Sequence, residues 1–288
     1  MTTIAVLVSF HPDPVQLKRN IEALATQVDD IVVVDNSPEK FEAFPISNYI
    51  WLPENAGVGR AQNIGIGKAK QLGADKILLS DQDSYFYPNA VGKLAKALDS
   101  SEDVAAAGPV YRELNSNQLS SFFKLKGYRC LRTSGAHLMV EETVQTDFLI
   151  SSGTLMKLSA FEDVGQMRED YFIDYVDTEW CIRAASMGHV LLGVGGEMMA
   201  HTLGDGSNRI WFGRWRWVAK HKPERYFYAF RNGVDLLIKR NLPLNWQVYL
   251  IRRLVGYFCF LIFLDRRWHA VACGYRGVIA SFDSRNVS

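Results

Sequence analysis

Two carboxylates, Asp81 and Asp83, lie two residues apart at the end of an apolar run. In an extended chain, side chains two residues apart point to the same side, so these carboxylates can converge on one point. Their oxygens suit Mg²⁺ or Mn²⁺, and such an ion keeps open positions that substrate phosphates can fill. The pattern predicts a divalent metal beside a phosphate-bearing ligand, although Asp-x-Asp is also common in solvated turns.

Residues 55–65, with the sequence Asn-Ala-Gly-Val-Gly-Arg-Ala-Gln-Asn-Ile-Gly, form a second candidate site. Glycines allow close backbone approach, and polar groups at the start of a helix can receive a diphosphate or a ribose. The segment matches neither the Gly-x-Gly-x-x-Gly fingerprint nor the phosphate loop of ATPases. It therefore supports neither a dinucleotide-dependent enzyme nor an ATPase of that class.

A third candidate, Asp177, comes at the predicted start of a helix that Gly188 ends. The dipole at a helix N-terminus favours the anionic form of a carboxylate, which keeps it ready to accept a proton at neutral pH. The same residue could instead cap the helix and contribute only stability. The residue taken alone leaves both roles open.

A sheet must position these acids, and three β-rich apolar runs predict its strands at residues 4–9, 31–35 and 77–81. Segments with helical features separate the runs, and this alternation is typical of an α/β fold with a parallel sheet. Open α/β sheets bind ligands at the carboxyl ends of their strands, where Asp35 and Asp81 stand. Both acids are thus expected near one crevice.

The connecting segments carry their own signals. An acidic cap, Asp13, precedes Pro14, and apolar residues recur at helical spacing from Leu17, which predicts the first helix. In residues 103–147 no period is sustained, and we expect strands and loops there around the entrance for an acceptor.

Composition indicates a globular enzyme of a reducing compartment. The chain has 288 residues, of which 48% are hydrophobic and 22% charged, so neither a disordered nor a polytopic membrane protein is indicated. Its four cysteines include no Cys-x-x-Cys pair, and the first apolar run is too short for a signal peptide. We therefore expect a cytoplasmic protein.

Charge is distributed unevenly along the chain. Up to Asn208 there are 17 Lys and Arg residues against 27 Asp and Glu residues, whereas beyond it there are 15 against 4. This asymmetry predicts an α/β domain in residues 1–208 and a basic, aromatic, helical extension in residues 209–288 that meets an anionic surface.

The extension carries a membrane-like pattern. Arg252-Arg253 and Arg266-Arg267 flank residues 254–264, an uncharged run that is too short to span a bilayer. Such a pattern is typical of a helix in the plane of a membrane surface. Packing on the α/β domain or on a second subunit is the alternative, and no known nucleic-acid-binding pattern is present. The tryptophans of the extension are Trp211, Trp215, Trp217, Trp246 and Trp268.

These motifs, in their order and spacing, resemble those of inverting family 2 glycosyltransferases with the GT-A fold. They are most similar to the bacterial rhamnosyltransferases that build O-antigen and related polysaccharides. The resemblance runs from Ile4 to about Arg240 and implies a Rossmann-like nucleotide-binding sheet flanked by helices, followed by a helical extension. The motifs are Val8-Ser9-Phe10-His11-Pro12, Val34-Asp35-Asn36-Ser37, residues 55–65, Ser80-Asp81-Gln82-Asp83, Asp174-Tyr175-Val176-Asp177-Thr178-Glu179, His201-x-Leu203-Gly204 and Arg231-Asn232.

The resemblance implies a role for each position. Asp177 would be the catalytic base, and Asp83 with His201 would ligate Mg²⁺ or Mn²⁺, although a lone histidine is as often a core or surface residue. Asp35 would contact the nucleobase or ribose, and Asp81 would reach the ribose and the metal. The implied nucleotide-binding residues are Ser9, His11, Asp35, Asn55, Arg60, Asn63, Asp81 and Gln82.

The implied reaction is the transfer of one L-rhamnose from dTDP-L-rhamnose to a glycan or lipid-linked glycan at the cytoplasmic face of the inner membrane. A homo-oligomer is compatible with the sequence, and nucleic acid is not expected as a partner. A UDP-hexose or UDP-galactofuranose donor is the first alternative. A sugar nucleotidyltransferase, whose glycine-rich loop residues 9–12 lack, and a non-catalytic nucleotide- or glycan-binding module are the others.

Two departures from the family pattern matter. The Gln-x-x-Arg-Trp motif of processive members is absent, and the nearest segment ends in Arg214-Trp215, which favours single transfers over polymer synthesis. Relatives often place Glu before the base, whereas Val176 stands here, so Asp174 remains a second candidate for the base.

Overall fold

The computed structural model describes residues 1–202, 207–211, 215–219, 221–239, 241–265 and 267–283. The chain divides into two compact units. The first comprises Met1–Phe123, Arg132–Phe172 and Val176–Thr202, and the second comprises Lys124–Leu131, Ile173–Tyr175 and Leu203–Ser288. The second unit therefore takes in two short segments from residues 1–202, and its main segment begins at Leu203. The division of the chain at residue 208 stays a prediction.

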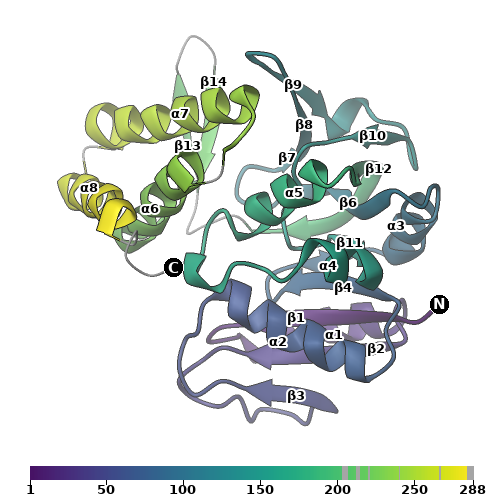
Figure 1. Cartoon of the computed structure of the whole chain (residues 1–288). Helices are drawn as coiled ribbons and strands as arrows, with labels where there is room; N and C mark the ends of the chain where they lie inside the picture. Colours follow the sequence, from purple (N-terminus) through teal and green to yellow (C-terminus); the bar gives the residue numbers. More distant parts are fainter. Residues whose placement is uncertain (203–206, 212–214, 220, 240, 266, 284–288) are drawn as a thin grey trace. The chain divides into compact units, whose positions relative to one another are not determined.

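The first unit is built on a mixed sheet, which Figure 1 shows from one side. Its strands in the described chain are β1 (Thr3–Ser9), β2 (Asp30–Asp35), β3 (Asn48–Trp51), β4 (Lys76–Asp81), β5 (Tyr85–Phe86), β6 (Val104–Glu113), β7 (Gln118–Leu119), β10 (Thr143–Gln145), β11 (Leu155–Lys157) and β12 (Val190–His201). They run in the order β10-β12-β6-β11-β4-β1-β2-β3, and β5 pairs with β12 and β7 with β6. The predicted α/β class is confirmed.

The parallel core of the sheet consists of the three predicted strands, β1, β2 and β4, together with β3. Ser9 lies opposite Asp35, and Val8 lies opposite Asp81, so the carboxyl ends of these strands meet at one edge. β11 pairs in antiparallel fashion with β4 and β6, whereas β6 and β12 are parallel. β4 and β12 therefore belong to one sheet, and the residues at their ends lie in the same unit as the predicted acids.

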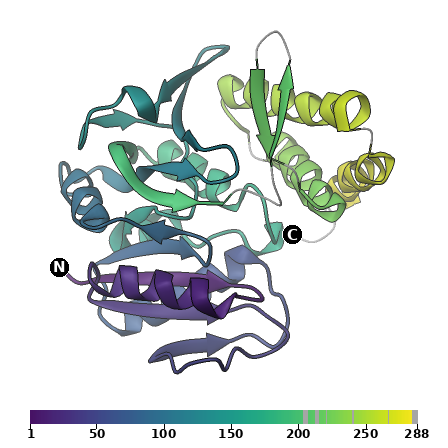
Figure 2. The ribbon, with the colours of Figure 1, turned by 180° about the vertical axis from the view of Figure 1, so that it is seen from behind.

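Helices cover both faces of the sheet, as Figures 1 and 2 together show. On one face, Leu17 and Leu24 pack with Leu7 in a buried cluster that spans the sheet. The predicted cap of the first helix is confirmed, because the Asp13 carboxylate accepts a hydrogen bond from Gln16 N at 2.8 Å. The helices of this unit are α1 (Pro14–Ala25), α2 (Val58–Gln71), α3 (Ala90–Leu98), α4 (Leu158–Val164) and α5 (Val176–Ser186), with 3₁₀ turns η1 (Gly135–His137) and η2 (Glu169–Tyr171).

The glycines of residues 55–65 let the chain approach itself closely. A Cβ atom at Gly65 would lie 2.3 Å from Val6 Cγ1, so α2 packs on the other face of the sheet only because Gly65 has no side chain. Gly57 has φ +84°, and a Cβ there would lie 2.7 Å from Phe172 Cα. The close approach that the sequence predicts for a ligand is therefore used at these two positions for packing within the protein.

Residues 103–147 form strands, turns and loops, as expected. β6 is followed by β7 and by a separate two-stranded sheet of β8 (Ser121–Lys126) and β9 (Arg129–Ser134). The tip of the β8–β9 hairpin belongs to the second unit, where Arg252 donates a hydrogen bond to the Tyr128 carbonyl at 2.8 Å.

The sequence led us to expect helices throughout residues 209–288, but two strands precede the helices there. β13 (Ser207–Trp211) and β14 (Trp215–Ala219) form an antiparallel pair, with Ile210 opposite Arg216. Arginine and tryptophan alternate in the sequence over residues 214–217, and this two-residue period is typical of strands. The helical expectation followed overall composition and missed that period. The calls at Leu203 and Gly204 lie outside the described residues.

Three helices and a π-helical segment make up the rest of the described second unit. They are α6 (Pro223–Lys239), α7 (Leu244–Cys259), η3 (Phe260–Asp265) and α8 (Trp268–Asp283). Phe230, Leu254 and Leu261 are buried together in its apolar core. A small core is enough to hold three amphipathic helices together because each helix hides one apolar face.

One helix in the described chain, Leu244–Phe263, is long and apolar enough by length and composition to cross a membrane. The sequence interpretation considered only residues 254–264 and judged them too short. The helix begins ten residues earlier than that run. Length and composition alone are weak evidence, since buried helices of other proteins share them.

Candidate functional site

Asp81, Asp83 and His201 form a cluster in the first unit. Each offers one ligand atom, and the three atoms lie within 4.8 Å of one another. Asp81 ends β4, Asp83 follows two residues later, and His201 ends β12, 118 residues further along the chain. Carboxylate oxygens with an imidazole nitrogen suit a divalent cation, so this donor set fits the metal that the sequence predicts. No sequence spacing could have shown that His201 lies there.

Two buried serines hold the cluster in place. Ser84 Oγ lies 2.8 Å from His201 Nδ1 and 2.5 Å from Ser152 Oγ. Asp81 N donates to Ser152 Oγ at 3.0 Å. The sequence analysis missed both serines. Ser84 could have been noticed because it adjoins Asp83, whereas Ser152 carries no local signal.

The imidazole of His201 is 5% exposed and lies beside several carboxylates. Burial alone would lower its pKa, but the hydrogen bond that the imidazole donates to Asp83 and the charges of Asp83, Asp81 and Glu113 outweigh burial and raise it. Asp83 Oδ1 lies 3.3 Å from Nδ1. A cation bound here would have to compete with a proton for this nitrogen.

Asp177 lies in the first turn of α5, one position inside the helix and not at the cap that the sequence predicts. Its Oδ1 accepts a hydrogen bond from Thr178 N at 2.6 Å, and its Oδ2 accepts one from Ser151 N at 3.3 Å. Backbone N–H groups at the start of a helix stabilise a carboxylate anion. The side chain is therefore held as a half-buried, oriented acceptor.

Tyr111 connects Asp177 electrostatically with the metal-binding cluster. Its ring lies edge-on to the His201 ring, with centroids 5.8 Å apart. Burial raises the pKa of Tyr111 to about 12, with further contributions from the charges of Glu113 and Asp177. The charge of Asp177 therefore acts on the Tyr111 hydroxyl, and the Tyr111 ring contacts the His201 ring.

Asp174, the second candidate for the base, is engaged in an ion pair within the second unit. Arg225 Nη2 and Nε donate to its carboxylate at 3.0 to 3.2 Å. If Asp174 accepted a proton, this bidentate ion pair would break, and such pairs are among the stronger charge-assisted contacts in proteins. The geometry therefore favours Asp177 over Asp174 as a proton acceptor.

Asp35 is 0% exposed at the end of β2. Its Oδ1 accepts hydrogen bonds from Ser37 N at 3.2 Å and Ser37 Oγ at 2.6 Å. Its Oδ2 accepts from Phe41 N at 3.0 Å and from the Tyr49 hydroxyl at 2.6 Å. A nucleotide contact by Asp35 would require one of these donors to be displaced, so the described conformation uses this carboxylate to fold the loop after β2.

Gln82 joins the ends of β1 and β4, whereas Ser9 and His11 join the end of β1 to the end of β2. Gln82 accepts from Phe10 N at 2.6 Å and donates to the Phe10 carbonyl at 3.0 Å. Ser9 Oγ lies 3.5 Å from Asp35 Oδ1, and His11 N donates to Ser37 Oγ at 2.7 Å. The His11 side chain is exposed. These bonds fix the loop of residues 9–12 beside the metal-binding cluster's strand.

Asn55, Arg60 and Asn63 lie around the start of α2. Asn55 Oδ1 accepts from Asn36 Nδ2 and from Gly57 N, both at 3.0 Å. Asn63 is buried and exchanges two hydrogen bonds of 2.9 Å with the Met167 backbone. Arg60 is exposed, with Nε 4.0 Å from Glu169. Asn63 thus serves the fold in the described conformation, whereas Arg60 presents its guanidinium to solvent.

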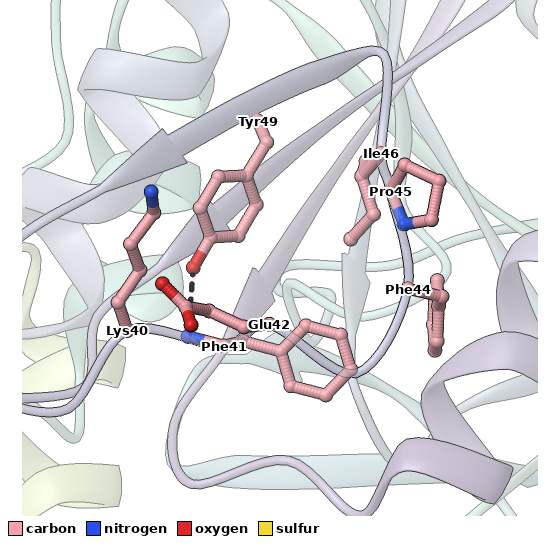
Figure 3. Close-up of a pocket in the computed structure, with 7 residues that line it drawn as sticks. All are labelled: Lys40, Phe41, Glu42, Phe44, Pro45, Ile46 and Tyr49. Carbon is pink, nitrogen blue, oxygen red and sulfur yellow. Dashed lines mark hydrogen bonds between the residues drawn. The ribbon is translucent and has the colours of Figure 1, made fainter.

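A pocket near the end of β2 lies beside the Asp35 network (Figure 3). The Tyr49 hydroxyl, which also bonds Asp35, accepts a hydrogen bond from Phe41 N at 3.1 Å in its wall. Burial, followed by the Asp35 hydrogen bond, raises the pKa of Tyr49, so its hydroxyl stays protonated. None of the predicted site residues lines this pocket. It has a volume of about 340 Å³ and is lined by Lys40, Phe41, Glu42, Phe44, Pro45, Ile46 and Tyr49.

The sequence has recognisable relatives. A family model described as glycosyl transferase family 2 matches residues 5–165. The dTDP-rhamnosyl transferase RfbF of Shigella flexneri is 34% identical in an alignment of 252 residues that covers 83% of this chain and 81% of that protein. The matched region contains most of β1, all of β2 and β4, and both aspartates of the Asp81, Asp83 and His201 cluster.

Two solved structures share the fold. The structure of GalNAc-T7 with UDP, GalNAc and Mn²⁺ has a TM-score of 0.58 at 14% identity, and the match covers 92% of this chain and 57% of that chain. The structure of S. aureus TarS residues 1–349 in complex with UDP-GlcNAc also has a TM-score of 0.58 at 14% identity, with coverages of 95% and 79%. At this identity the likeness shows a shared arrangement of elements and nothing about substrates.

Proposed function

Because the chain belongs to glycosyl transferase family 2, we propose that it transfers L-rhamnose from dTDP-L-rhamnose to a hydroxyl group of a glycan, with inversion at the anomeric carbon. The protein is a glycosyltransferase with the GT-A fold. The identity to a dTDP-rhamnosyl transferase supports the donor. The observation that carries the reaction type is the Asp81, Asp83 and His201 cluster, in the same unit as Asp177.

Asp83 and His201, with Asp81, would hold Mg²⁺ or Mn²⁺ in this proposal. When bound, such a cation supplies positive charge that offsets the charge developing on a departing nucleoside diphosphate. Ser84 and Ser152 keep His201 and Asp81 in position through their hydrogen bonds. A fixed set of ligands binds more tightly because less conformational freedom is lost on binding.

Asp177 accepts the proton of the attacking acceptor hydroxyl in this proposal. The N–H groups of Ser151 and Thr178 orient its carboxylate, and the first turn of α5 keeps it anionic. Direct attack by the acceptor on the anomeric carbon, from the face opposite the leaving group, inverts the configuration. A single general base suffices for such a displacement.

The donor is tested by a screen of nucleotide sugars. We expect the protein with Mn²⁺ to release dTDP from dTDP-L-rhamnose, in the presence of a rhamnose-containing glycan acceptor, about tenfold or more faster than UDP from UDP-glucose or UDP-galactofuranose. Nucleoside diphosphate release, measured by chromatography, reports the rate. Faster release from a UDP-sugar would contradict the donor, and no release from any donor would contradict the reaction.

We also propose that the acceptor is a lipid-linked glycan, as in O-antigen assembly, and that the protein is peripheral at the cytoplasmic face of the inner membrane. Exposed apolar residues support a membrane surface as partner. On α7, Leu244, Ile251, Val255 and Phe258 are spaced by seven, four and three residues, so they share one face. On α8, the same spacing relates Trp268, Tyr275, Ile279 and Phe282.

Charge supports the same partner. The chain beyond Asn208 carries a net charge of +11, with 15 basic and 4 acidic residues, which attracts anionic lipids. Two adjacent arginines lie within the helix that is long enough to cross a membrane, and each would cost about 2.5 to 3.5 kcal/mol at the bilayer centre. An orientation along the surface keeps both arginines in water or at headgroups.

Flotation with liposomes tests this partner. We expect the protein to float with phosphatidylglycerol-containing vesicles at low salt, and Phe258→Asp to lower the bound fraction about tenfold, because an apolar contact is replaced by a charge. Val15→Asp is the matched control, since Val15 is exposed on α1 in the first unit. Equal loss in both variants, or protein that resists extraction by alkaline carbonate, would contradict peripheral binding through α7.

A further inference from the structure

Arg253 on α7 is an arginine surrounded by tyrosines. Its Nη1 donates to the Tyr249 hydroxyl at 3.1 Å, and its Nη2 donates to the Tyr257 hydroxyl at 3.0 Å. Its Cζ lies 5.4 Å from the ring centroids of both Tyr175 and Tyr257. Among the residues that the structure describes, no carboxylate forms an ion pair with it, although the side chain is exposed. A cation in this setting keeps its affinity for an anion.

The Tyr175 hydroxyl is the second observation. Tyr175 is 6% exposed, and its hydroxyl oxygen is buried with no hydrogen-bond partner in the described structure. Arg253, Tyr257 and Tyr249 all act electrostatically on this hydroxyl. A buried hydroxyl without a partner costs about 1 to 3 kcal/mol, so its retention beside a guanidinium calls for a ligand.

The backbone around Tyr175 is held in an uncommon conformation. Both Asp174 and Tyr175 have φ +64°, in the left-handed region that most residues avoid. Asn232 on α6 holds this segment by donating to the carbonyls of Ile173 and Asp174, both at 2.9 Å. Such strain persists where the surrounding structure fixes it, and it is concentrated at functional positions.

We propose that Arg253, Tyr175, Tyr249 and Tyr257 form a binding site for a phosphate-type oxyanion in the second unit. A guanidinium has five N–H donors, of which the two tyrosine hydroxyls use two. The remaining donors can meet two oxygens of one phosphate side by side. The hydroxyl of Tyr257, which accepts from Arg253, keeps its own proton for donation.

The donors of this site stay protonated across the neutral range. Burial raises the pKa of Tyr175 and of Tyr249, while Arg253 acts against the shift in both. The carboxylate whose charge acts on Tyr175 is that of Asp174, which Arg225 already holds. The site therefore offers hydrogen-bond donors and one uncompensated positive charge, which is the complement of a phosphate.

The role of the site rests on the proposed function, because a lipid-linked glycan acceptor carries phosphate between its lipid and its sugars. A membrane lipid headgroup and a free phosphate present the same chemistry. The binding measurement below uses neither metal nor sugar donor. Its failure is therefore distinguishable from failure of rhamnose transfer.

Calorimetric titration of the full chain with inorganic pyrophosphate, in the presence of EDTA, tests the site. We expect Arg253→Gln to raise the dissociation constant about tenfold or more, because charge-assisted hydrogen bonds are lost. Tyr175→Phe is expected to raise it about threefold or more and to leave the melting temperature unchanged or higher, since no protein hydrogen bond is lost. A purely structural Tyr175 would not alter pyrophosphate binding.

Arg276→Gln is the charge-matched control, since Arg276 is exposed on α8 in the same unit. Its dissociation constant is expected to stay within about twofold of the parent value. A second arm measures binding to phosphatidylglycerol vesicles. If pyrophosphate does not bind but Arg253→Gln alone weakens vesicle binding, the site takes a headgroup phosphate. Equal effects of Arg253→Gln and Arg276→Gln in both arms, or no effect of either, would overturn the proposal.

Discussion

Replacing Asp177 with Asn is expected to lower the rate of sugar transfer by about 10²- to 10⁴-fold, the usual contribution of a general base. The amide keeps an oxygen that can accept from Thr178 N, so the first turn of α5 should remain folded. It cannot accept a proton from the acceptor hydroxyl. Single-turnover transfer of rhamnose, measured at saturating donor, reports the loss directly. Donor affinity should stay within about threefold, because Asn is isosteric with Asp and the proposed partner of Asp177 is the acceptor hydroxyl.

Asp174→Asn is the informative comparison. Its carboxylate is paired with Arg225, so we expect a smaller loss of rate accompanied by a lower melting temperature, because the ion pair is weakened. If Asp174→Asn lost transfer while Asp177→Asn stayed active, the base would be Asp174 and not Asp177. If both stayed active, general-base catalysis by this segment would be excluded.

The second large effect concerns the metal-binding cluster. We expect Asp83→Ala to weaken Mn²⁺ binding by about 100-fold or more, since even residues that only support a ligand contribute 10- to 100-fold. Mn²⁺ binding is measured by electron paramagnetic resonance of the free ion, which is independent of activity. Transfer should fall in parallel, EDTA should abolish it, and added Mn²⁺ should restore it only to the parent protein.

Asp103→Asn is a suitable control, because Asp103 is exposed in the first unit and its carboxylate accepts a hydrogen bond from nearby Ser101. Metal affinity that is unchanged in Asp83→Ala, or lowered equally in Asp103→Asn, would show that the cation binds elsewhere. Activity that survives complete removal of divalent ions would contradict the metal dependence of the reaction.

The same cluster predicts a pH dependence. The pKa of His201 is raised in the metal-free protein, so its proton is held to a higher pH than that of an ordinary histidine. A metal binds the neutral imidazole, and affinity for Mn²⁺ should therefore fall as the pH is lowered through this raised pKa. The decrease should begin at a higher pH than for a solvent-exposed histidine ligand, and His201→Gln should remove that part of the profile.

Much of the α/β scaffold could be predicted because its signals are local. The apolar runs that became β1, β2 and β4 have the length and composition of buried strands, and Asp13 with Pro14 starts α1 where the sequence indicates. Strands of a parallel sheet end at one edge, so Asp35 and Asp81 could be placed there in advance. The alternation of Arg and Trp over residues 214–217 is also a local signal, and it indicates a strand where overall composition indicated a helix.

Other features depend on contacts between distant segments. Ser84 and Ser152 meet only because β4 and the loop before β11 are neighbours, and Asp174 is distinguished from Asp177 by Arg225 on α6. The glycines before and within α2 fit a ligand loop equally well by pattern. Whether they approach a phosphate or Val6 and Phe172 depends on what the fold places against them.

The sequence by itself indicated the family through a resemblance of its motifs. Local apolar runs and spacing indicated three strands of the sheet and the two aspartates at and after the end of β4. The resemblance implied that His201 joins those aspartates, and the tertiary structure places it beside them. Only the tertiary structure showed that protein donors engage the Asp35 carboxylate and that three tyrosines surround Arg253. Side chains that are far apart in the chain acquire their chemistry from the neighbours that packing supplies, and no local pattern specifies those neighbours.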